Sequence, residues 1–293
     1  MENKFIFALG FFDGVHLGHR ALLDACVELA DSVNGVAGAV TFLDHPDALV
    51  LGSNPALINT PADRRHLLHR FGAVQVLELP FDKAMMAVAW DAFLAMLVEK
   101  HGAAGFVCGK DFRFGHKGQG TAEKLAAYCA ENGLACRIVP QVMLGDTPVS
   151  STHIRSLLEQ GRMEEADRFL GHPHLLSGEV VSGRHLGRTL GIPTANLNLP
   201  EGVVQLPHGV YACVAKADGS RYLAVTNIGS RPTVGGHHIT VEPWILDFDA
   251  DLYGKTLELE FHKFLRPERK FDSLEELKAQ IRSDAAQTRE LLK

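Results

Sequence analysis

The segment formed by residues 5–30 constrains the fold of this chain more than any other stretch. It begins with five apolar residues, Phe5–Leu9, which predict a short buried strand. Residues 10–14 form a turn that contains two glycines, and from residue 20 onward apolar side chains recur at helical spacing. A strand, a glycine-containing turn and a helix together point the amides of a helix N-terminus at a phosphate group.

Two histidines, His16 and His19, lie at the start of this helix with Leu17 and Gly18 between them. Two imidazoles beside open amides would stabilise negative charge that develops on a phosphorus atom. Histidine pairs in loops are nevertheless common, and the turn lacks both the GxGxxG and the GxxxxGK[ST] patterns. The local residues therefore leave phosphate chemistry and an ordinary loop as open interpretations.

The complete pattern GxFDGxHxGH, residues 10–19, is more specific than its parts. It resembles the HxGH nucleotidylyltransferase superfamily, and its FDG sequence is similar to the FAD synthetase module of prokaryotic bifunctional riboflavin kinase/FAD synthetases. The resemblance implies that His16 and His19 are catalytic and stabilise the transition state. It also implies a set of ATP-binding residues in the turn: Gly10, Phe11, Asp13 and Gly14.

Strand and helix patterns alternate through the first half of the chain. Strands are predicted at Val36–Phe42, 74–79 and 105–108, and helices at 63–71, 90–100, 122–131 and Met163–Leu170. This alternation predicts an α/β domain with a parallel, Rossmann-like sheet. The helix at 63–71 carries basic side chains that we interpret as a solvated face: Arg64, Arg65, His66, His69 and Arg70.

Two further motifs follow in this half. In GKDFRFGHKGQGT, residues 109–121, aromatic residues alternate with charged ones, which suits either a tight turn with core phenylalanines or a wall for a flavin ring. In VSSTHIRSLLEQG, residues 149–161, hydroxyl side chains precede a helix and could be N-caps or phosphate ligands. DFRFG and SSTxxR are similar to family motifs, which implies that Asp111, Phe112 and Phe114 bind flavin and that Ser151, Thr152 and Arg155 bind the ATP phosphates.

The second half has a different pattern of short alternating strands, at 178–182, 209–216, 222–228, 239–246 and 257–265. A final helix at 273–292 begins with Ser273, and Glu276 completes a capping box. Successive strands without intervening helices predict an antiparallel β-barrel closed by this helix. With a linker at residues 171–177, we expect two domains, 1–171 and 178–293.

The sequence SGRHLGRTLGIPTANLNLP, residues 182–200, concentrates the chemistry of this half. Its glycines leave amides open to phosphate, and its hydroxyl and amide side chains offer oxygen ligands for Mg²⁺, although a glycine-rich hairpin is also possible. GRxLGxPTAN resembles the riboflavin kinase signature. The resemblance implies phosphate binding by Gly183, Gly187 and Gly191, and Mg²⁺ binding by Thr194 and Asn196.

Glu242 lies in a predicted strand and could be a surface carboxylate or the acceptor of a hydroxyl proton. The resemblance to riboflavin kinases implies that Glu242 is the catalytic base. Family members usually have Thr-His after this glutamate, whereas this chain has Pro243 and Trp244. Because proline removes a backbone donor, we expect a sheet edge or a bulge there.

Composition limits the class of partner and the compartment. The 293 residues carry a net charge of −6, which does not favour a nucleic-acid partner. The five cysteines are odd in number and form no CxxC pair, so we expect reduced, mostly buried thiols. We see neither a signal-peptide pattern nor an apolar run of about 20 residues, and we therefore expect a cytoplasmic protein without membrane contact.

The resemblance extends over essentially the whole chain and implies a bifunctional transferase. One domain would phosphorylate riboflavin to FMN with MgATP, and the other would adenylylate FMN with a second ATP to give FAD and pyrophosphate. Two alternatives remain: a nucleotidylyltransferase for another phosphorylated acceptor, and a flavin-binding protein without turnover. The sequence does not predict the oligomeric state.

Overall fold

The computed structural model describes residues 4–50, 52, 55–182, 191–198, 201–233 and 236–293. The chain divides into two units. The first consists of Met1–Ala56 and Pro61–Ser151, and the second of Leu57–Thr60 and Thr152–Lys293. The predicted linker at residues 171–177 remains a prediction, and β8 of the second unit begins within it, at His174.

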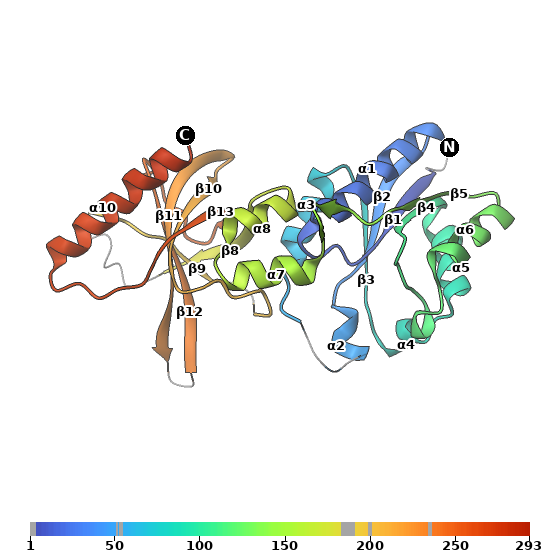
Figure 1. Cartoon of the computed structure of the whole chain (residues 1–293), viewed down its shortest axis with the longest axis horizontal. Helices are drawn as coiled ribbons and strands as arrows, with labels where there is room; N and C mark the ends of the chain where they lie inside the picture. Colours follow the sequence, from blue (N-terminus) through green and yellow to red (C-terminus); the bar gives the residue numbers. More distant parts are fainter. Residues whose placement is uncertain (1–3, 51, 53–54, 183–190, 199–200, 234–235) are drawn as a thin grey trace. The chain divides into compact units, whose positions relative to one another are not determined.

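A parallel sheet forms the centre of the first unit, as predicted, and it has five strands, of which the sequence predicted the first four (Figure 1). Its strands are β1 (Phe5–Leu9), β2 (Val36–Phe42), β3 (Gln75–Leu79), β4 (Ala103–Gly109) and β5 (Ala135–Val139). The strand order is β3-β2-β1-β4-β5, so the chain moves outward from β1 to β3 and then returns to β1's other side. This reversal creates a topological switch point beside β1, where open α/β sheets bind their ligands.

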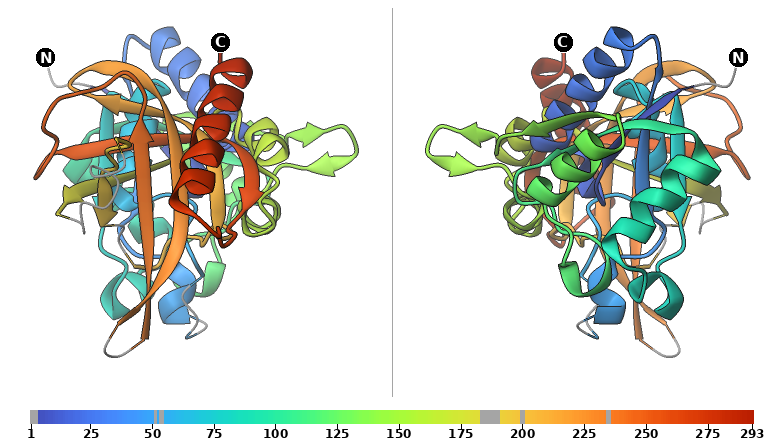
Figure 2. Two further views of the ribbon diagram at one scale, coloured as in Figure 1. Left: turned by 90° about the vertical axis from the view of Figure 1, so that its left-hand side faces the viewer. Right: turned by 90° about the vertical axis from the view of Figure 1, so that its right-hand side faces the viewer.

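Helices cover both faces of the sheet. The helices α1 (Leu17–Ser32) and α3 (Pro61–Arg70) bury their apolar side chains against one face, and α5 (Trp90–His101) and α6 (Ala122–Glu131) against the other (Figure 2). Along β1, Ile6 and Ala8 join the first core and Phe7 and Leu9 the second, as the two-residue period of a strand requires. The first unit also contains short elements: η1 (Asp13–Val15), α2 (Pro46–Val50), α4 (Lys83–Met86), η2 (His116–Gly118), β6 (Met143–Leu144) and β7 (Thr147–Pro148).

The helix α3 corrects our interpretation of its basic residues. Arg65, His66, His69 and Arg70 are exposed, but Arg64 is fully buried. The buried side of α3 also includes Leu67 and Leu68, one turn further along the helix. A count of charges along the helix missed this because the partners of Arg64 are backbone carbonyls at the end of β2.

A closed antiparallel barrel forms the second unit, as predicted. Its strands, in the described residues, are β8 (His174–Val181), β9 (Asn196–Asn198), β10 (Gly209–Ala217), β11 (Ser220–Thr233), β12 (Gly236–Ile245) and β13 (Thr256–Pro267). The order β10-β11-β12-β9-β8-β13 closes through the pairing of β13 with β10. Two helices, α7 (Ser151–Glu159) and α8 (Met163–Leu170), precede the barrel.

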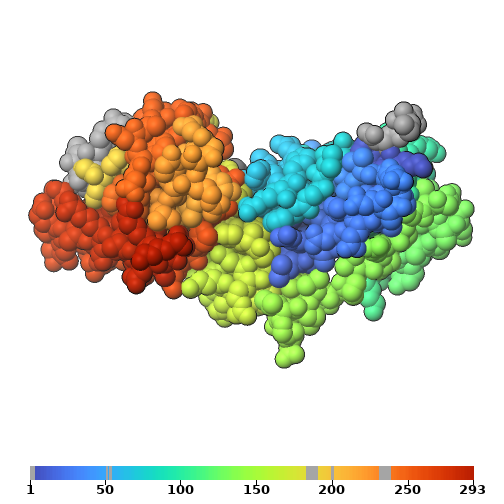
Figure 3. Space-filling view, turned by 90° about the horizontal axis from the view of Figure 1, so that it is seen from above, coloured from blue at the N-terminus to red at the C-terminus, as the bar shows by residue number. Residues whose placement is uncertain are grey.

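The last helix, α10 (Leu274–Leu291), packs on β10 and β11 (Figure 3). Its start matches the predicted cap, because the Ser273 hydroxyl accepts a hydrogen bond from the Glu276 amide. The Glu276 carboxylate in turn accepts from the amide of Asp272, one residue earlier than in a standard capping box. The helix therefore has a defined N-terminus against the barrel.

Pro243 produces no bulge in the β11–β12 ladder, and β12 as a whole is not an edge strand of the barrel. Pro243 lies opposite Thr226 without a shift in register, and β12 lies between β11 and β9. The Pro243 carbonyl accepts a hydrogen bond from the Ala195 amide, 2.9 Å away, so its nitrogen also faces away from β11. The backbone N–H that proline lacks would have pointed toward the β9 side of β12, at a position that β9 does not reach. The ladder between β12 and β11 therefore loses no hydrogen-bond donor.

All five cysteines are free thiols, as predicted: Cys26, Cys108, Cys129 and Cys213 are buried, and Cys136 is half-buried. In the described part of the chain, no helix combines the length and the apolar character that crossing a membrane requires.

Candidate active sites

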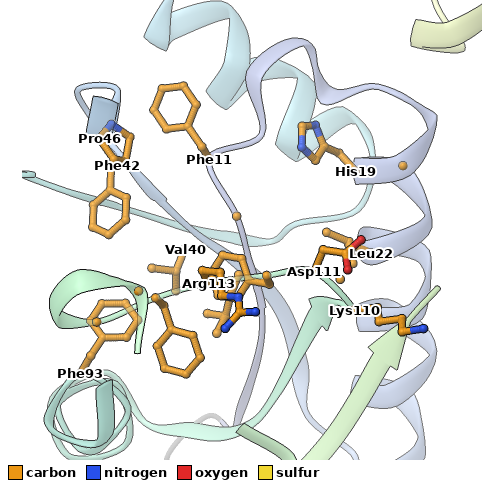
Figure 4. Close-up of a pocket in the computed structure, with 18 of the residues that line it drawn as sticks. Phe11, His19, Leu22, Val40, Phe42, Pro46, Phe93, Lys110, Asp111 and Arg113 are labelled. Carbon is orange, nitrogen blue, oxygen red and sulfur yellow. The ribbon is translucent and has the colours of Figure 1, made fainter. Parts of the chain in front are cut away.

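A cavity of about 820 Å³ opens at the carboxyl ends of β1 and β4, beside the switch point of the parallel sheet. Gly10 and Phe11 line it from the end of β1, and Gly109 and Lys110 from the end of β4. Figure 4 shows the aromatic rings of Phe42 and Phe93 toward one end, whereas His19 and Lys110 lie toward the other. The cavity therefore offers an apolar end for a flat ring system and a polar end for phosphates.

The predicted histidine pair lies in the wall of this cavity. His16 is the N-cap of α1, and its Nδ1 accepts a hydrogen bond of 3.3 Å from the His19 amide. The two imidazole rings stack with centroids 3.6 Å apart and an interplanar angle of 12°. Gly18 leaves room for the His16 ring, because a Cβ there would lie 3.1 Å from Cε1 of His16, closer than an ordinary van der Waals contact.

The environment of His19 keeps its imidazole neutral. Burial, together with the neighbouring His16 and Arg64, lowers the pKa of His19 well below 6.5. His19 Nδ1 has no hydrogen-bond partner in the described structure. The N–H of a neutral imidazole beside a helix N-terminus can donate a hydrogen bond to a phosphate oxygen that enters the cavity.

The turn between β1 and α1 is held in a strained conformation. Phe12, Gly14 and Val15 have φ angles of 61°, 80° and 37°, and positive values at non-glycine residues are costly. Asp13 is buried, and its carbonyl accepts a hydrogen bond of 2.9 Å from the hydroxyl of Ser151. Of the predicted ATP-binding residues, Gly10 and Phe11 line the cavity, whereas Asp13 and Gly14 are buried and do not line it.

The predicted flavin residues also line this cavity: Asp111, Phe112 and Phe114. The two phenylalanine rings stack 5.5 Å apart at an angle of 16°, and Trp90 meets Phe114 edge-on. Gly115 lets the loop approach α5, because a Cβ at this position would lie 2.5 Å from Cα of Trp90. The structure thus brings this motif to the same cavity as the histidine pair.

Of the second phosphate motif, Ser151 is joined to the site through its bond to Asp13. Thr152 and Arg155 follow on α7 and belong to the second unit, so their position beside the histidines remains a prediction. Several other lining residues carry no local signal in the sequence, because they are spread over separate elements: Phe42, Phe81, Met85 and Phe93.

A second cavity, of about 310 Å³, lies between the barrel and α10. Glu242 and Trp244 line it from alternate positions of β12, and Asn227 lines it from β11, directly opposite Glu242. On the helix side, Leu277 and Ile281 face it. The predicted carboxylate therefore lies in a cavity that combines aromatic and apolar side chains with polar and charged ones.

A third cavity, of about 370 Å³, is lined by the intervening residues of β12, Pro243 and Ile245, and by Phe248 and Tyr253. Thr194 lines both the second and the third cavity. Thr194 is therefore shared by the walls of both cavities.

The remaining predicted residues of this half are placed as follows. Asn196 is half-buried at the start of β9, opposite Val181, and Gly191 is exposed with φ of 71°. Gly183 and Gly187 lie outside the described residues.

Sequence reasoning missed a polar network at the far wall of the second cavity. The Arg266 guanidinium pairs with the Asp284 carboxylate at 2.8 Å, and Asp284 is only 2% exposed. Gln280 also donates to Asp284, and Arg269 donates to Gln280. The sequence shows Asp284 as a carboxylate within a polar stretch of α10, but it does not show that this carboxylate is buried. Its partner, Arg266, lies 18 residues earlier, and only the fold brings the two together.

Two family models match this chain and together cover most of it. The FAD synthetase model matches residues 1–153, and the riboflavin kinase model matches residues 170–292. These matches agree with the parallel α/β unit and the barrel unit. The chain thus falls into the class of two-domain transferases that carry a nucleotidyltransferase module and a kinase module.

Individual relatives of this class are similar to the chain over almost its full length. The bifunctional riboflavin kinase/FMN adenylyltransferase of Listeria monocytogenes is 33% identical, covering 98% of this chain and 92% of the relative. The Escherichia coli K12 protein of the same name is 36% identical, covering 97% and 92%. This chain belongs to the family of bifunctional riboflavin kinases/FMN adenylyltransferases, and it carries the domains of both activities.

A solved structure has the same overall fold. A crystal structure of a protein from Streptococcus pneumoniae, named there a macrolide-efflux protein, matches with a TM-score of 0.87 and 31% identity. The match covers 99% of this chain and 95% of that one, so both units of the fold are shared.

Proposed function

We propose that this chain makes FAD from riboflavin in two ATP-dependent steps that take place in separate cavities. Residues 178–293 transfer the γ-phosphoryl group of MgATP to the 5′-hydroxyl of riboflavin, and residues 1–171 transfer the adenylyl group of a second ATP to FMN. The observation that carries the proposal is the separation of the motifs: the histidine pair lines one cavity, and Thr194 and Glu242 line another.

In the kinase step, riboflavin occupies the second cavity and MgATP the third. Trp244 and Ile281 provide apolar surface for the flavin ring, while the Glu242 carboxylate accepts the proton of the 5′-hydroxyl as its oxygen attacks the γ-phosphorus. The bond from the γ-phosphorus to the bridging oxygen breaks, and ADP leaves. Thr194, which lines both cavities, is placed for the junction of the two substrates.

Mg²⁺ enters this step as part of the ATP substrate. The Thr194 hydroxyl and the Asn196 amide oxygen are hard ligands of the kind that Mg²⁺ prefers, and the ion usually keeps several waters and phosphate oxygens as its other ligands. Gly183, Gly187 and Gly191 bind the phosphates. The position of Thr194 at the cavity junction supports this assignment.

In the adenylyl step, a phosphate oxygen of FMN attacks the α-phosphorus of ATP and pyrophosphate leaves. Phe112 and Phe114 bind the flavin ring at the apolar end, with Asp111 beside them. His16 and His19 stabilise charge on the α-phosphate and on the leaving group, and neutral imidazoles do so as hydrogen-bond donors.

The other phosphate contacts come from the turn and from α7. In the turn, we assign ATP binding to Gly10, Phe11, Asp13 and Gly14. We assign the departing phosphates to Ser151, Thr152 and Arg155, whose hydroxyls and guanidinium suit an anion. No covalent intermediate on the protein is required.

We further propose that the chain acts in the cytoplasm on these small molecules, without a nucleic-acid partner. The five free thiols and the net charge of −6 support this proposal.

The decisive experiment incubates the purified chain with riboflavin, ATP and Mg²⁺ and measures FMN, FAD, ADP and pyrophosphate separately. We expect FMN to appear first, with ADP, and FAD to follow with pyrophosphate. Incubation with supplied FMN should give FAD without ADP. Formation of neither flavin nucleotide would refute the proposal, and formation of FMN alone would remove the adenylyl step from it.

A further inference from the structure

Arg64 of α3 is among the largest fully buried side chains of the described chain, with 0% of its surface exposed. A guanidinium remains charged at all ordinary pH values, and arginine is almost never fully buried unless it is paired. Burial lowers the pKa of Arg64, and nearby carboxylates, that of buried Asp13 foremost, act in the opposite direction. An apolar side chain of similar volume would cost less, so stability alone does not explain an arginine here.

The contacts of Arg64 tie together the carboxyl ends of two strands. Its NH2 group donates to the carbonyl of Phe42 at 2.6 Å and to that of Leu43 at 3.4 Å, both at the end of β2. Its guanidinium carbon lies 4.3 Å from the ring centroid of Phe11, which follows β1 and lines the large cavity. The backbone of Phe11 is also held by the Thr41 hydroxyl, which donates to its carbonyl at 2.8 Å.

The remaining donors of Arg64 are unused. Nε and NH1 have no hydrogen-bond partner in the described structure, although both are buried. The charge is close enough to His19 to lower the pKa of its imidazole. In a low-dielectric interior, a fixed positive charge acts on a nearby phosphate more strongly than it would in water.

We propose that Arg64 is a positioning residue for adenylyl transfer. It fixes Phe11 against the end of β2, and it keeps a buried positive charge behind the cavity wall beside the histidine pair, where it favours binding of the ATP phosphates. The inference rests on the proposed adenylyl transfer in this cavity. It gives Arg64 a role that a solvated basic face would not have.

The test compares Arg64→Met, which removes the charge, with Arg64→Lys, which keeps it without the planar fork. Arg65→Met is the matched control, because Arg65 is the next residue on α3 but is 51% exposed and paired with Glu78. Each protein is assayed for FAD formation from FMN, with KM for ATP and kcat determined separately. FMN formation by the other unit of the same chain reports on the quality of each preparation.

We expect Arg64→Met to raise the KM for ATP at least ~10-fold, the effect of losing one favourable charge interaction, while Arg64→Lys recovers most of the loss and Arg65→Met changes little. Equal loss of kcat in both Arg64 variants, with unchanged KM, would show a merely structural role and overturn the inference. If Arg64→Met does not fold, Arg64→Gln replaces it, and a Gln variant with the ATP KM of the Lys variant would overturn the inference equally.

Calorimetric binding of magnesium pyrophosphate separates this inference from the proposed function, because it requires no turnover. We expect the wild-type chain and Arg65→Met to bind pyrophosphate and Arg64→Met to bind it at least ~10-fold more weakly. A wild-type chain that binds pyrophosphate in this way but forms no FAD would refute the adenylyl step and leave the role of Arg64 in phosphate binding intact. Equal affinities of wild type and Arg64→Met would overturn the inference.

Discussion

Glu242 lies in the second cavity because it alternates with Pro243 along β12, and Asn227 lies opposite it on β11. We expect Glu242→Gln to lower riboflavin kinase turnover at least ~100-fold, since the amide keeps the shape of the side chain but cannot accept the hydroxyl proton. FMN formation under saturating substrates measures this effect. FAD formation from supplied FMN is the control and should not change. Unaltered kinase turnover would exclude Glu242 as the base.

A more specific prediction concerns Thr194, which lines both the second and the third cavity and carries a single hydroxyl. Thr194→Ala should weaken the Mg²⁺-dependent binding of ATP in the kinase step, whereas Thr194→Ser, which keeps the oxygen ligand, should retain it. The measurement is the rate of FMN formation as a function of Mg²⁺ at fixed ATP. Superimposable magnesium titrations for the Ala variant and the wild type would contradict a ligand role.

At the scale of elements, the first turn of α1 combines a structural cap with the proposed catalytic pair. Replacing both His16 and His19 with Ala should abolish FAD formation and spare FMN formation, because the two activities belong to different units. The loss of the cap alone would cost about 1 kcal/mol of stability. His16→Asn provides the matched control, since asparagine restores the cap acceptor without the imidazole, and it should remain deficient in FAD formation. Equal loss of both activities in the double variant would contradict independent sites.

The elements also show what the sequence could predict. The strands β1 and β2 and the helix α8 have the predicted bounds, because their apolar periodicity is local and strong. The strand β9 was missed because three residues carry too little pattern and pair only through partners far along the chain. The motif residues were predictable because each motif is continuous in sequence. The cavity walls were not, since they combine side chains from separate elements.

Arg64 and Pro243 were misread for the same physical reason. Charge on a helix usually indicates a solvated face, and proline in a strand usually indicates an edge, but both rules describe average surroundings. For Arg64 the surroundings are two carbonyls and an aromatic ring, and for Pro243 they are a neighbouring segment that requires no donor. Tertiary contacts of this kind determine the surroundings of a single residue, and they leave the hydrophobic pattern of its helix or strand unchanged.

At the scale of the whole molecule, two ionisable groups in the second unit, one buried and one half-buried, set opposite pH dependences of stability. His174, at the start of β8, is 0% exposed, and burial lowers its pKa to about 3. Asp167 of α8 accepts a hydrogen bond of 3.0 Å from the His174 amide, and burial raises its pKa to about 8. Both groups are therefore neutral in the folded protein over a wide range of pH.

The signs follow from the difference between folded and unfolded pKa values. Below the unfolded value of 6.5, the unfolded chain protonates His174 and the folded chain does not, so folded stability falls as the pH decreases toward 3. For Asp167 the unfolded chain ionises above 3.8 and the folded chain does not, so stability falls as the pH rises toward 8. Between 3.8 and 6.5 the two contributions offset each other, each up to about 1.4 kcal/mol per pH unit.

When one of the two groups is removed, the pH dependence of stability should reflect the other group alone. On acidification from about pH 6.5 to pH 5, His174→Leu should gain stability relative to wild type, and Asp167→Asn, which keeps the acceptor oxygen for the His174 amide, should lose it. Urea unfolding measures both, with Trp90→Phe as the background so that Trp244 is the single tryptophan and reports on the second unit alone. A substitution can lower the stability of a variant at every pH. The comparison therefore uses only how the free energy of unfolding of each protein changes with pH. Parallel pH profiles in all three proteins would mean that neither group is held neutral by the fold.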